Sequence, residues 1–122
     1  MMEINQLEAE YTYEQDLDIV NIKVKKEYAY SQSIDFDAGV FLDFDENDFP
    51  VNLEIIDASK RMNIDKEFLI KPSGNVNIHI YSNLIELKVQ FKNNGENHVL
   101  EYQDKHDANL RITDSETHLA LV

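Results

Sequence analysis

Residues 38–62, which read A-G-V-F-L-D-F-D-E-N-D-F-P-V-N-L-E-I-I-D-A-S-K-R-M, decide the expected fold. Apolar side chains occupy every second position in residues 40–44 and again in residues 51–55. Because successive side chains of a strand point to opposite faces, this period predicts two strands with one buried face each. The intervening Glu46-Asn47-Asp48 predicts a turn, since Asn and Asp tolerate the left-handed backbone conformation. The stretch therefore predicts a β-hairpin.

The same alternation predicts strands on both sides of this hairpin. They are expected at residues 18–26, 28–37, 67–71, 75–81, 85–92, 97–103, 109–113 and 118–122. Between the later strands, turns are expected at Ser82-Asn83, at residues 104–107 and, with the strongest signal, at Asn94-Gly95.

The remaining segments are short. Residues 1–10 are expected to form a helical turn or to fray, and Tyr11 and Tyr13 to begin an edge strand. Residues 57–62 are expected to form a helical turn capped by Asp57 or Ser59. We therefore predict a mainly β fold: an antiparallel meander packed as two small sheets, sandwich or barrel-like, with at most one or two short helical turns.

The length of 122 residues fits one domain, residues 1–122. Within it, two β-meander units at residues 11–62 and 67–122 are one interpretation. Val20-x-Ile22-x-Val24 matches Leu87-x-Val89-x-Phe91, and later strands match at nearly the same offset. A chance alignment of two meanders is the alternative, because period two is common to all half-buried strands.

The charge is strongly negative. The 24 acidic and 11 basic residues give a net charge of −13. Such a surface repels nucleic-acid phosphates, so no nucleic-acid partner is expected. It attracts cationic proteins or metal ions, and solubility alone is the alternative explanation.

The chain has no cysteine, which excludes disulfides and cysteine-ligated metal sites. Residues 1–10 show no signal-peptide pattern, and no stretch is long and apolar enough to cross a membrane. We therefore expect a cytoplasmic protein with no membrane partner.

The acidic hairpin of residues 43–54 is a candidate metal site. Asp43-x-Asp45-x-Asn47, followed by Glu54, is similar in spacing to a calcium-binding loop, although the glycine of such a loop is Asp48 here. A looser site for a hard cation would use the five carboxylates Asp35, Asp37, Asp43, Asp45 and Asp48. A solvated acidic turn is the alternative.

No other pattern indicates catalysis. The histidines His79, His98, His106 and His118 lack the spacing of metal ligands, and no phosphate-binding glycine motif occurs. We therefore expect no enzymatic activity and no cofactor. The tyrosines Tyr11, Tyr13, Tyr28 and Tyr30 predict either an interface or cross-strand packing pairs.

Three segments carry a resemblance to a known family. They are Tyr13-Glu14-x-Asp16-x-Asp18, Asp37-x-Gly39-Val40-x-Leu42-Asp43-x-Asp45 and Glu54-Ile55-Ile56-Asp57-Ala58-Ser59. In this order they resemble the domain of unknown function 2283 family over residues 11–62. Two glycines typical of that family are Asp48 and Asn52 here. The resemblance implies a small β-rich domain with no assigned activity, and it leaves open whether the second half is a diverged copy.

These observations favour a non-enzymatic protein-interaction module. It would act as a homodimer or as the acidic partner of a basic protein, in the manner of an antitoxin or an inhibitor. The alternative is a domain that binds a divalent metal or a small ligand through the acidic hairpin.

Overall fold

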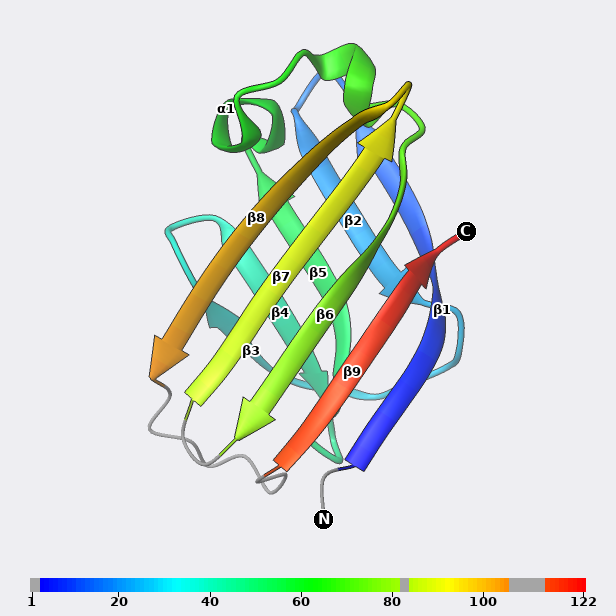
Figure 1. Cartoon of the computed structure of the whole chain (residues 1–122). Coiled ribbons are helices and arrows are strands. Elements are labelled where there is room, and N and C mark those ends of the chain that lie inside the picture. The colour runs from blue at the N-terminus through cyan, green and yellow to red at the C-terminus, as the bar shows by residue number, and fades with distance from the viewer. Residues whose placement is uncertain (1–2, 82–83, 106–113) are drawn as a thin grey trace.

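The computed structural model of the chain describes residues 3–81, 84–105 and 114–122. Its elements, all but η1 labelled in Figure 1, are β1 (Glu3–Glu14), β2 (Ile19–Val24), β3 (Tyr30–Asp35), β4 (Val40–Asp45), β5 (Pro50–Ile56), α1 (Ala58–Met62), the 3₁₀ helix η1 (Lys66–Leu69), β6 (Ser73–Tyr81), β7 (Leu84–Asn93), β8 (Glu96–Lys105) and β9 (Asp114–Leu121). The expected mainly β class is confirmed. The strand predicted at residues 109–113 and the turn predicted at Ser82-Asn83 lie outside the described residues.

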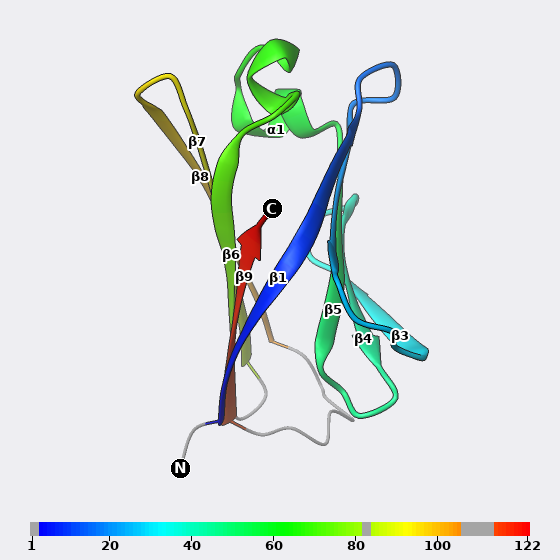
Figure 2. The ribbon, with the colours of Figure 1, turned by 90° about the vertical axis from the view of Figure 1, so that its right-hand side faces the viewer.

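The described strands form a single sheet of nine strands, in the order β3-β4-β5-β2-β1-β9-β6-β7-β8. The sheet curls so that its two halves face each other like the layers of a sandwich, as Figure 2 shows. The two layers are therefore halves of one sheet, and the fold is more than a meander, because the pairing of β1 with β9 is parallel. The other strand pairs among the described residues are antiparallel.

Strand β1 lies at the centre of this order. Its residues 9–14 pair with β2, and its residues 3–9 pair with β9. The prediction of a helical turn in residues 1–10 is therefore wrong, and the strand predicted from Tyr11 already begins at Glu3. Strand β9 pairs with the first part of β1 and β2 with the second, and this tertiary pairing overrides the weak local preference of the sequence.

Apolar side chains of both halves form one core between the layers. The alternation predicted for the hairpin is confirmed, since Val40, Leu42, Phe44, Val51, Leu53 and Ile55 are all fully buried. The facing half contributes Val76, Ile78, Ile80, Ile85, Leu87, Val89 and Phe91. Across the core, the ring of Tyr11 on β1 meets that of Phe91 on β7 edge-on, with centroids 5.7 Å apart.

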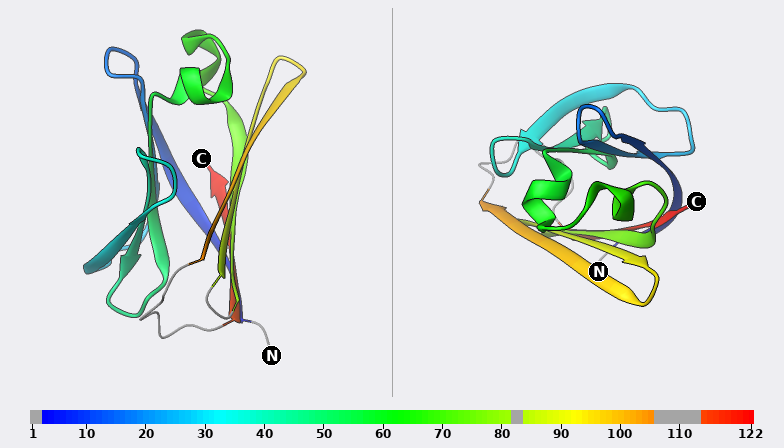
Figure 3. Two further views of the ribbon diagram at one scale, coloured as in Figure 1. Left: turned by 90° about the vertical axis from the view of Figure 1, so that its left-hand side faces the viewer. Right: turned by 90° about the horizontal axis from the view of Figure 1, so that it is seen from above.

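The segment between β5 and β6 closes one end of the sandwich. In Figure 3 the helices α1 and η1 lie between the two layers. The helical turn predicted at residues 57–62 is confirmed, whereas the strand predicted at residues 67–71 is wrong. Residues 66–69 instead form a 3₁₀ turn, because the chain crosses from one layer to the other and inserts Leu69 into the core.

The halves differ in strand order. If the two units were repeats, the constant spacing between their matching motifs would pair β2 with β7 and β3 with β8 as equivalent strands. Strands β7 and β8 are neighbours, whereas β4 and β5 separate β2 from β3. The division of the chain into two repeated units stays a prediction, and part of the proposed second unit lies outside the described residues.

Two glycines with positive φ provide a test of the packing within the second half. A Cβ on Gly74 (φ +155°) would collide with the backbone carbonyl of Gln90, whereas a Cβ on Gly95 (φ +80°) would meet no atom within 4 Å. We expect Gly74→Ala to lower the free energy of unfolding by about 2 kcal/mol or more, and Gly95→Ala by about 1 kcal/mol through backbone strain alone. Urea denaturation measures both, and a larger loss for Gly95→Ala would contradict the β6–β7 pairing.

Candidate functional site

Asp18, in the turn between β1 and β2, is a buried carboxylate that connects three elements. Its Oδ1 accepts hydrogen bonds from Tyr13 Oη at 2.7 Å and from the backbone N–H of Ser59 at 3.1 Å. Its Oδ2 accepts a hydrogen bond from Ser59 Oγ at 2.7 Å. The backbone carbonyl of Asp18 accepts a fourth, from Ala58 N–H at 3.0 Å. Asp18 therefore fixes the first turn of α1 to the end of β1.

This arrangement corrects the expected cap of α1. Asp57 occupies the N-cap position in the left-handed conformation, but its side chain makes no capping hydrogen bond. Asp18, 41 residues before Ser59, serves that purpose instead. Sequence patterns identify capping residues only within a few residues of a helix, so they could not identify Asp18 as the residue that caps α1.

The electrostatics of the cluster keep Asp18 ionised. Burial raises the pKa of its carboxyl, but hydrogen bonds from Tyr13 and Ser59 and the charge of Lys66 together hold the pKa below its usual value. The pKa of Tyr13 is raised, first by burial and then by its bond to Asp18. An ionised carboxylate that already accepts these hydrogen bonds is a structural acceptor and a poor general base.

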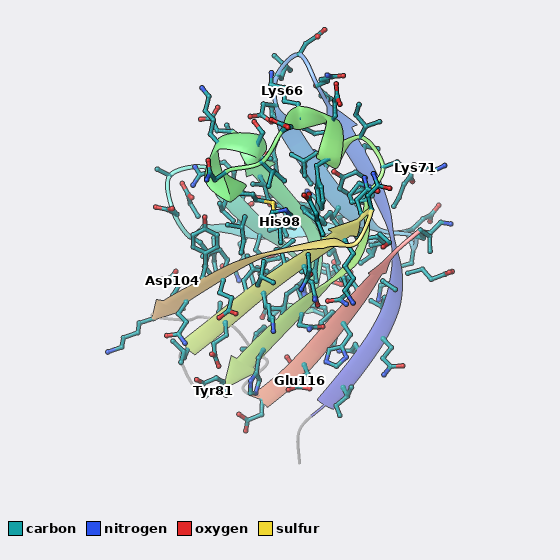
Figure 4. All side chains as sticks on the ribbon, turned by 45° about the horizontal axis from the view of Figure 1, so that its top comes forward. Lys66, Lys71, Tyr81, His98, Asp104 and Glu116 are labelled. Atoms are coloured by element: carbon teal, nitrogen blue, oxygen red, sulfur yellow. The ribbon has the colours of Figure 1, made fainter. Side chains whose placement is uncertain are left out.

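A cleft of about 800 Å³ lies between the α1–η1 segment and the β7–β8 hairpin. Its lining includes Ser59, Lys60, Asp65, Glu67, Phe68, Glu96 and His98. Figure 4 shows His98 beneath the helical segment. The ring of Phe68 meets the imidazole of His98 edge-on at 4.8 Å. His98 Nε2 lies 3.6 Å from Glu96 and has no hydrogen-bond partner among the described residues. The lining has three carboxylates, Asp65, Glu67 and Glu96, and one lysine, Lys60, so the cleft is acidic.

The five carboxylates predicted to bind a metal are each engaged by other groups. Asp35 accepts hydrogen bonds from the backbone N–H groups of its own hairpin, and the bond from Gly39 is the main cause that lowers its pKa. Asp37 pairs with Arg61 at 3.2 Å, while Asp43 accepts hydrogen bonds from Ser33 and Asn52. Asp48 accepts one from Gln32.

Asp45 differs most from expectation, because the alternation of residues 40–44, continued by one position, points its side chain outward, whereas it is only 6% exposed. A register irregularity between Asp43 and Phe44 turns the end of β4, and the Asp45 carboxylate then accepts the N–H groups of Asn47 and Phe49. Within residues 3–81, 84–105 and 114–122, no group of three or more His, Cys, Asp or Glu side chains could hold a metal ion. The metal site stays a prediction.

The four tyrosines predicted as an interface do not form one cluster. The side chains of Tyr11 and Tyr13 point inward, and the Tyr11 hydroxyl donates to the carbonyl of Leu69. Tyr28 lies under the ammonium group of Lys23, whose Nζ is 5.7 Å from the ring centroid. Tyr30 is 60% exposed. Tyr28 is half-buried and also packs against the core, so Tyr30 alone among the four is exposed, and the interface stays a prediction.

Sequence reasoning missed one histidine cluster. His79 on β6 lies between Glu86 on β7, at 3.8 Å, and Glu116 on β9, at 4.0 Å. His118 Nε2 lies 3.3 Å from Glu116. These residues meet only through the register of three strands, which no spacing along the chain reveals. His106 lies outside the described residues.

The Asp18 cluster makes a pH-dependent prediction. We expect Asp18→Asn to lower the free energy of unfolding by about 2 kcal/mol near pH 7, because an amide nitrogen would face the Tyr13 and Ser59 donors. The folded pKa of Asp18 lies below its unfolded value of 3.8, so its contribution is present above that value and is lost as the pH falls through the folded pKa. Urea denaturation of wild type and variant should therefore differ at neutral pH and converge in acid. The control Asp16→Asn, at an exposed residue of the same turn, should change little. Equal losses of unfolding free energy in the two variants would contradict the role of Asp18 in fixing α1 to the end of β1.

Comparison with known proteins concerns the first half of the chain. Residues 10–59 match the model of a family described as protein of unknown function (DUF2283). An uncharacterized protein from Methanocaldococcus jannaschii is 44% identical over 63 residues, which are 51% of this chain and 50% of that relative. The chain thus spans about half the length of the curated relative it matches. No solved structure matches the chain. The resemblance seen in the sequence is confirmed: the segment that holds Tyr13, Asp18 and Ser59 is similar to the DUF2283 family.

Proposed function

We propose that this protein is a non-enzymatic module that binds a basic protein through the outer face of its β1–β5 half. The observation that carries the proposal is the charge of this face. Six carboxylates, exposed or half-exposed, lie on it: Glu8, Glu10, Glu14, Asp35, Asp43 and Glu54. We call these six residues the acidic face. On the outward positions of the same described strands, Lys23 is the one basic residue.

The strand register places these side chains next to one another. Glu10 lies opposite Lys23, which lies opposite Asn52, which in turn lies opposite Asp43. In the adjacent cross-strand row, Glu54 lies opposite Phe41. The carboxylates therefore share one sheet surface, where their fields add and attract a cationic partner.

Apolar groups lie among these carboxylates. Ile19 and Ile56, which are directly opposite each other, and Phe41 are half-buried on the same outer face. Interfaces between proteins typically combine apolar contacts at the centre with a polar, charged rim. This composition supports a protein partner over a simple counterion atmosphere.

Two further observations support a basic partner over the other functions considered. The lowered pKa of Asp18 and its hydrogen bonds to Tyr13 and Ser59 favour a structural role for this buried carboxylate. Self-association is the second interaction considered, but two copies that each carry −13 repel one another at low ionic strength. The proposal therefore commits to an acidic partner of a basic protein, as an antitoxin-like or inhibitor-like binder would be.

The proposal predicts which carboxylates matter for binding. The test variant is Glu10→Gln/Glu14→Gln/Glu54→Gln, and the matched control is Glu86→Gln/Asp114→Asn/Glu116→Gln, which removes the same charge from strands β7 and β9 of the other half. Proteins captured on the immobilised full chain at low salt are identified, and each purified partner is titrated against all three proteins. We expect a basic partner whose affinity falls about tenfold or more in the test variant, since several close charge contacts are lost.

The control variant should bind that partner nearly as well as wild type. Equal losses in the two triple variants would show that only bulk charge matters. That result, or a partner that is not basic, would contradict the proposed face.

A further inference from the structure

Glu54 lies at the centre of the acidic face. Its strand, β5, has β2 and β1 on one side and β4 and β3 on the other. On the outer surface, the register places Asn21 of β2 and Phe41 of β4 directly beside Glu54. The residues that contribute most to the affinity of a protein interface cluster near its centre. Glu54 therefore has the position expected of such a residue.

Apolar side chains border Glu54. Phe41 lies directly opposite it, and Ile56, two positions further along β5, points to the same outer face. Ile19 lies opposite Ile56 and completes this border. These three side chains and Glu54 are half-buried, whereas the three carboxylates of β1 are exposed. Apolar groups that exclude water strengthen an ion pair beside them, because the effective dielectric constant falls.

The Glu54 carboxylate has no partner of its own. Within the part of the chain that the structure describes, it takes part in no hydrogen bond or ion pair. Asp35 and Asp43, by contrast, already accept hydrogen bonds from Gly39 and Asn52. A half-buried carboxylate without a partner has lost part of its hydration and gained nothing in return. A cation supplied by a binding partner would compensate for that loss.

The surroundings of Glu54 favour arginine over lysine as this cation. A guanidinium group pairs with a carboxylate through two parallel hydrogen bonds, stacks on aromatic rings and is more weakly hydrated than an ammonium group. Phe41 supplies the ring beside Glu54. Ile19 and Ile56 supply apolar surface for the aliphatic part of the side chain. A lysine could use the charge of Glu54 but not the paired hydrogen bonds.

We propose that Glu54 anchors an arginine of the basic partner, whose guanidinium group pairs with the carboxylate and lies against Phe41. This inference rests on the proposed function, because it names the partner residue that the acidic face selects and the place where that residue binds. Electrostatic attraction by the whole face brings the partner close, and the Glu54 site distinguishes arginine-rich from lysine-rich segments.

Two peptides of equal charge test this anchor: hexa-arginine and hexa-lysine, both with capped ends. Each is titrated against the protein at low salt. We expect hexa-arginine to bind about fivefold more tightly, because a bidentate pair and a cation–π contact add to the attraction that both peptides share. In isotope-labelled protein, the amide shift changes caused by hexa-arginine should centre on residues 19, 41, 54 and 56. Equal affinities, or shift changes centred on other residues, would overturn the proposal.

Three single variants locate the preference for arginine. Glu54→Gln removes the carboxylate, and Phe41→Leu removes the ring without a change of net charge. Each should bring the affinities of the two peptides to within about twofold of each other. The matched control Glu86→Gln, which removes a half-buried carboxylate from the outer face of the other half, should keep the preference. Circular dichroism checks that all three variants are folded.

A preference that survives in Glu54→Gln or in Phe41→Leu would overturn the proposal, and so would its loss in Glu86→Gln. The proposed function is tested separately, by the captured partner and the two triple variants. A basic partner that depends on the acidic face, together with peptides that bind equally, would overturn only the arginine anchor. The two failures are therefore distinguishable.

Discussion

The structure depends on one strand, β1, pairing with two partners at once. The partner of β1 changes from β9 to β2 at Ala9, which lies opposite both Val24 on β2 and Leu121 on β9. Its small side chain is fully buried. Through this shared strand the sheet folds over on itself, so the apolar face of each half is covered by the other. In the described part of the chain no helical layer covers either half, since α1 and η1 close only one end.

The sequence predicted those strands whose burial repeats every second residue. For β2, β4, β5, β6 and β7, alternation alone identified the strand and its buried face. It failed for β1, whose backbone is satisfied by strands from opposite ends of the chain. It also failed at η1, where a single apolar side chain, Leu69, had to enter the core from a crossing segment.

The candidate sites were less predictable than the fold. Asp18 and Ser59 are adjacent in space but 41 positions apart. Both lie in segments that resemble the family, but nothing in the two segments indicates that these side chains meet. Asp45 was assigned to the wrong side because alternation assumes an unbroken ladder, and β4 ends with an irregularity. The His79 cluster depends on strand register, which composition and spacing do not determine. Long-range pairing thus accounts for what the sequence did not reveal.

The two halves contribute different features. Residues 10–59, which resemble the DUF2283 family, contain the Tyr13–Asp18–Ser59 cluster and most of the acidic face. The second half supplies the facing layer of the core. In the proposed function the acidic face attracts a basic partner, and the second half covers the core behind that face.

The pairing of β1 can be measured directly by nuclear Overhauser contacts between backbone protons in isotope-labelled protein. The structure predicts contacts of Tyr11 with Ile22, in an antiparallel pattern, and of Gln6 with His118, in a parallel pattern. Both sets should appear in the same sample. Contacts of β1 with β2 alone, or sequential amide contacts typical of a helix in residues 3–9, would contradict the account.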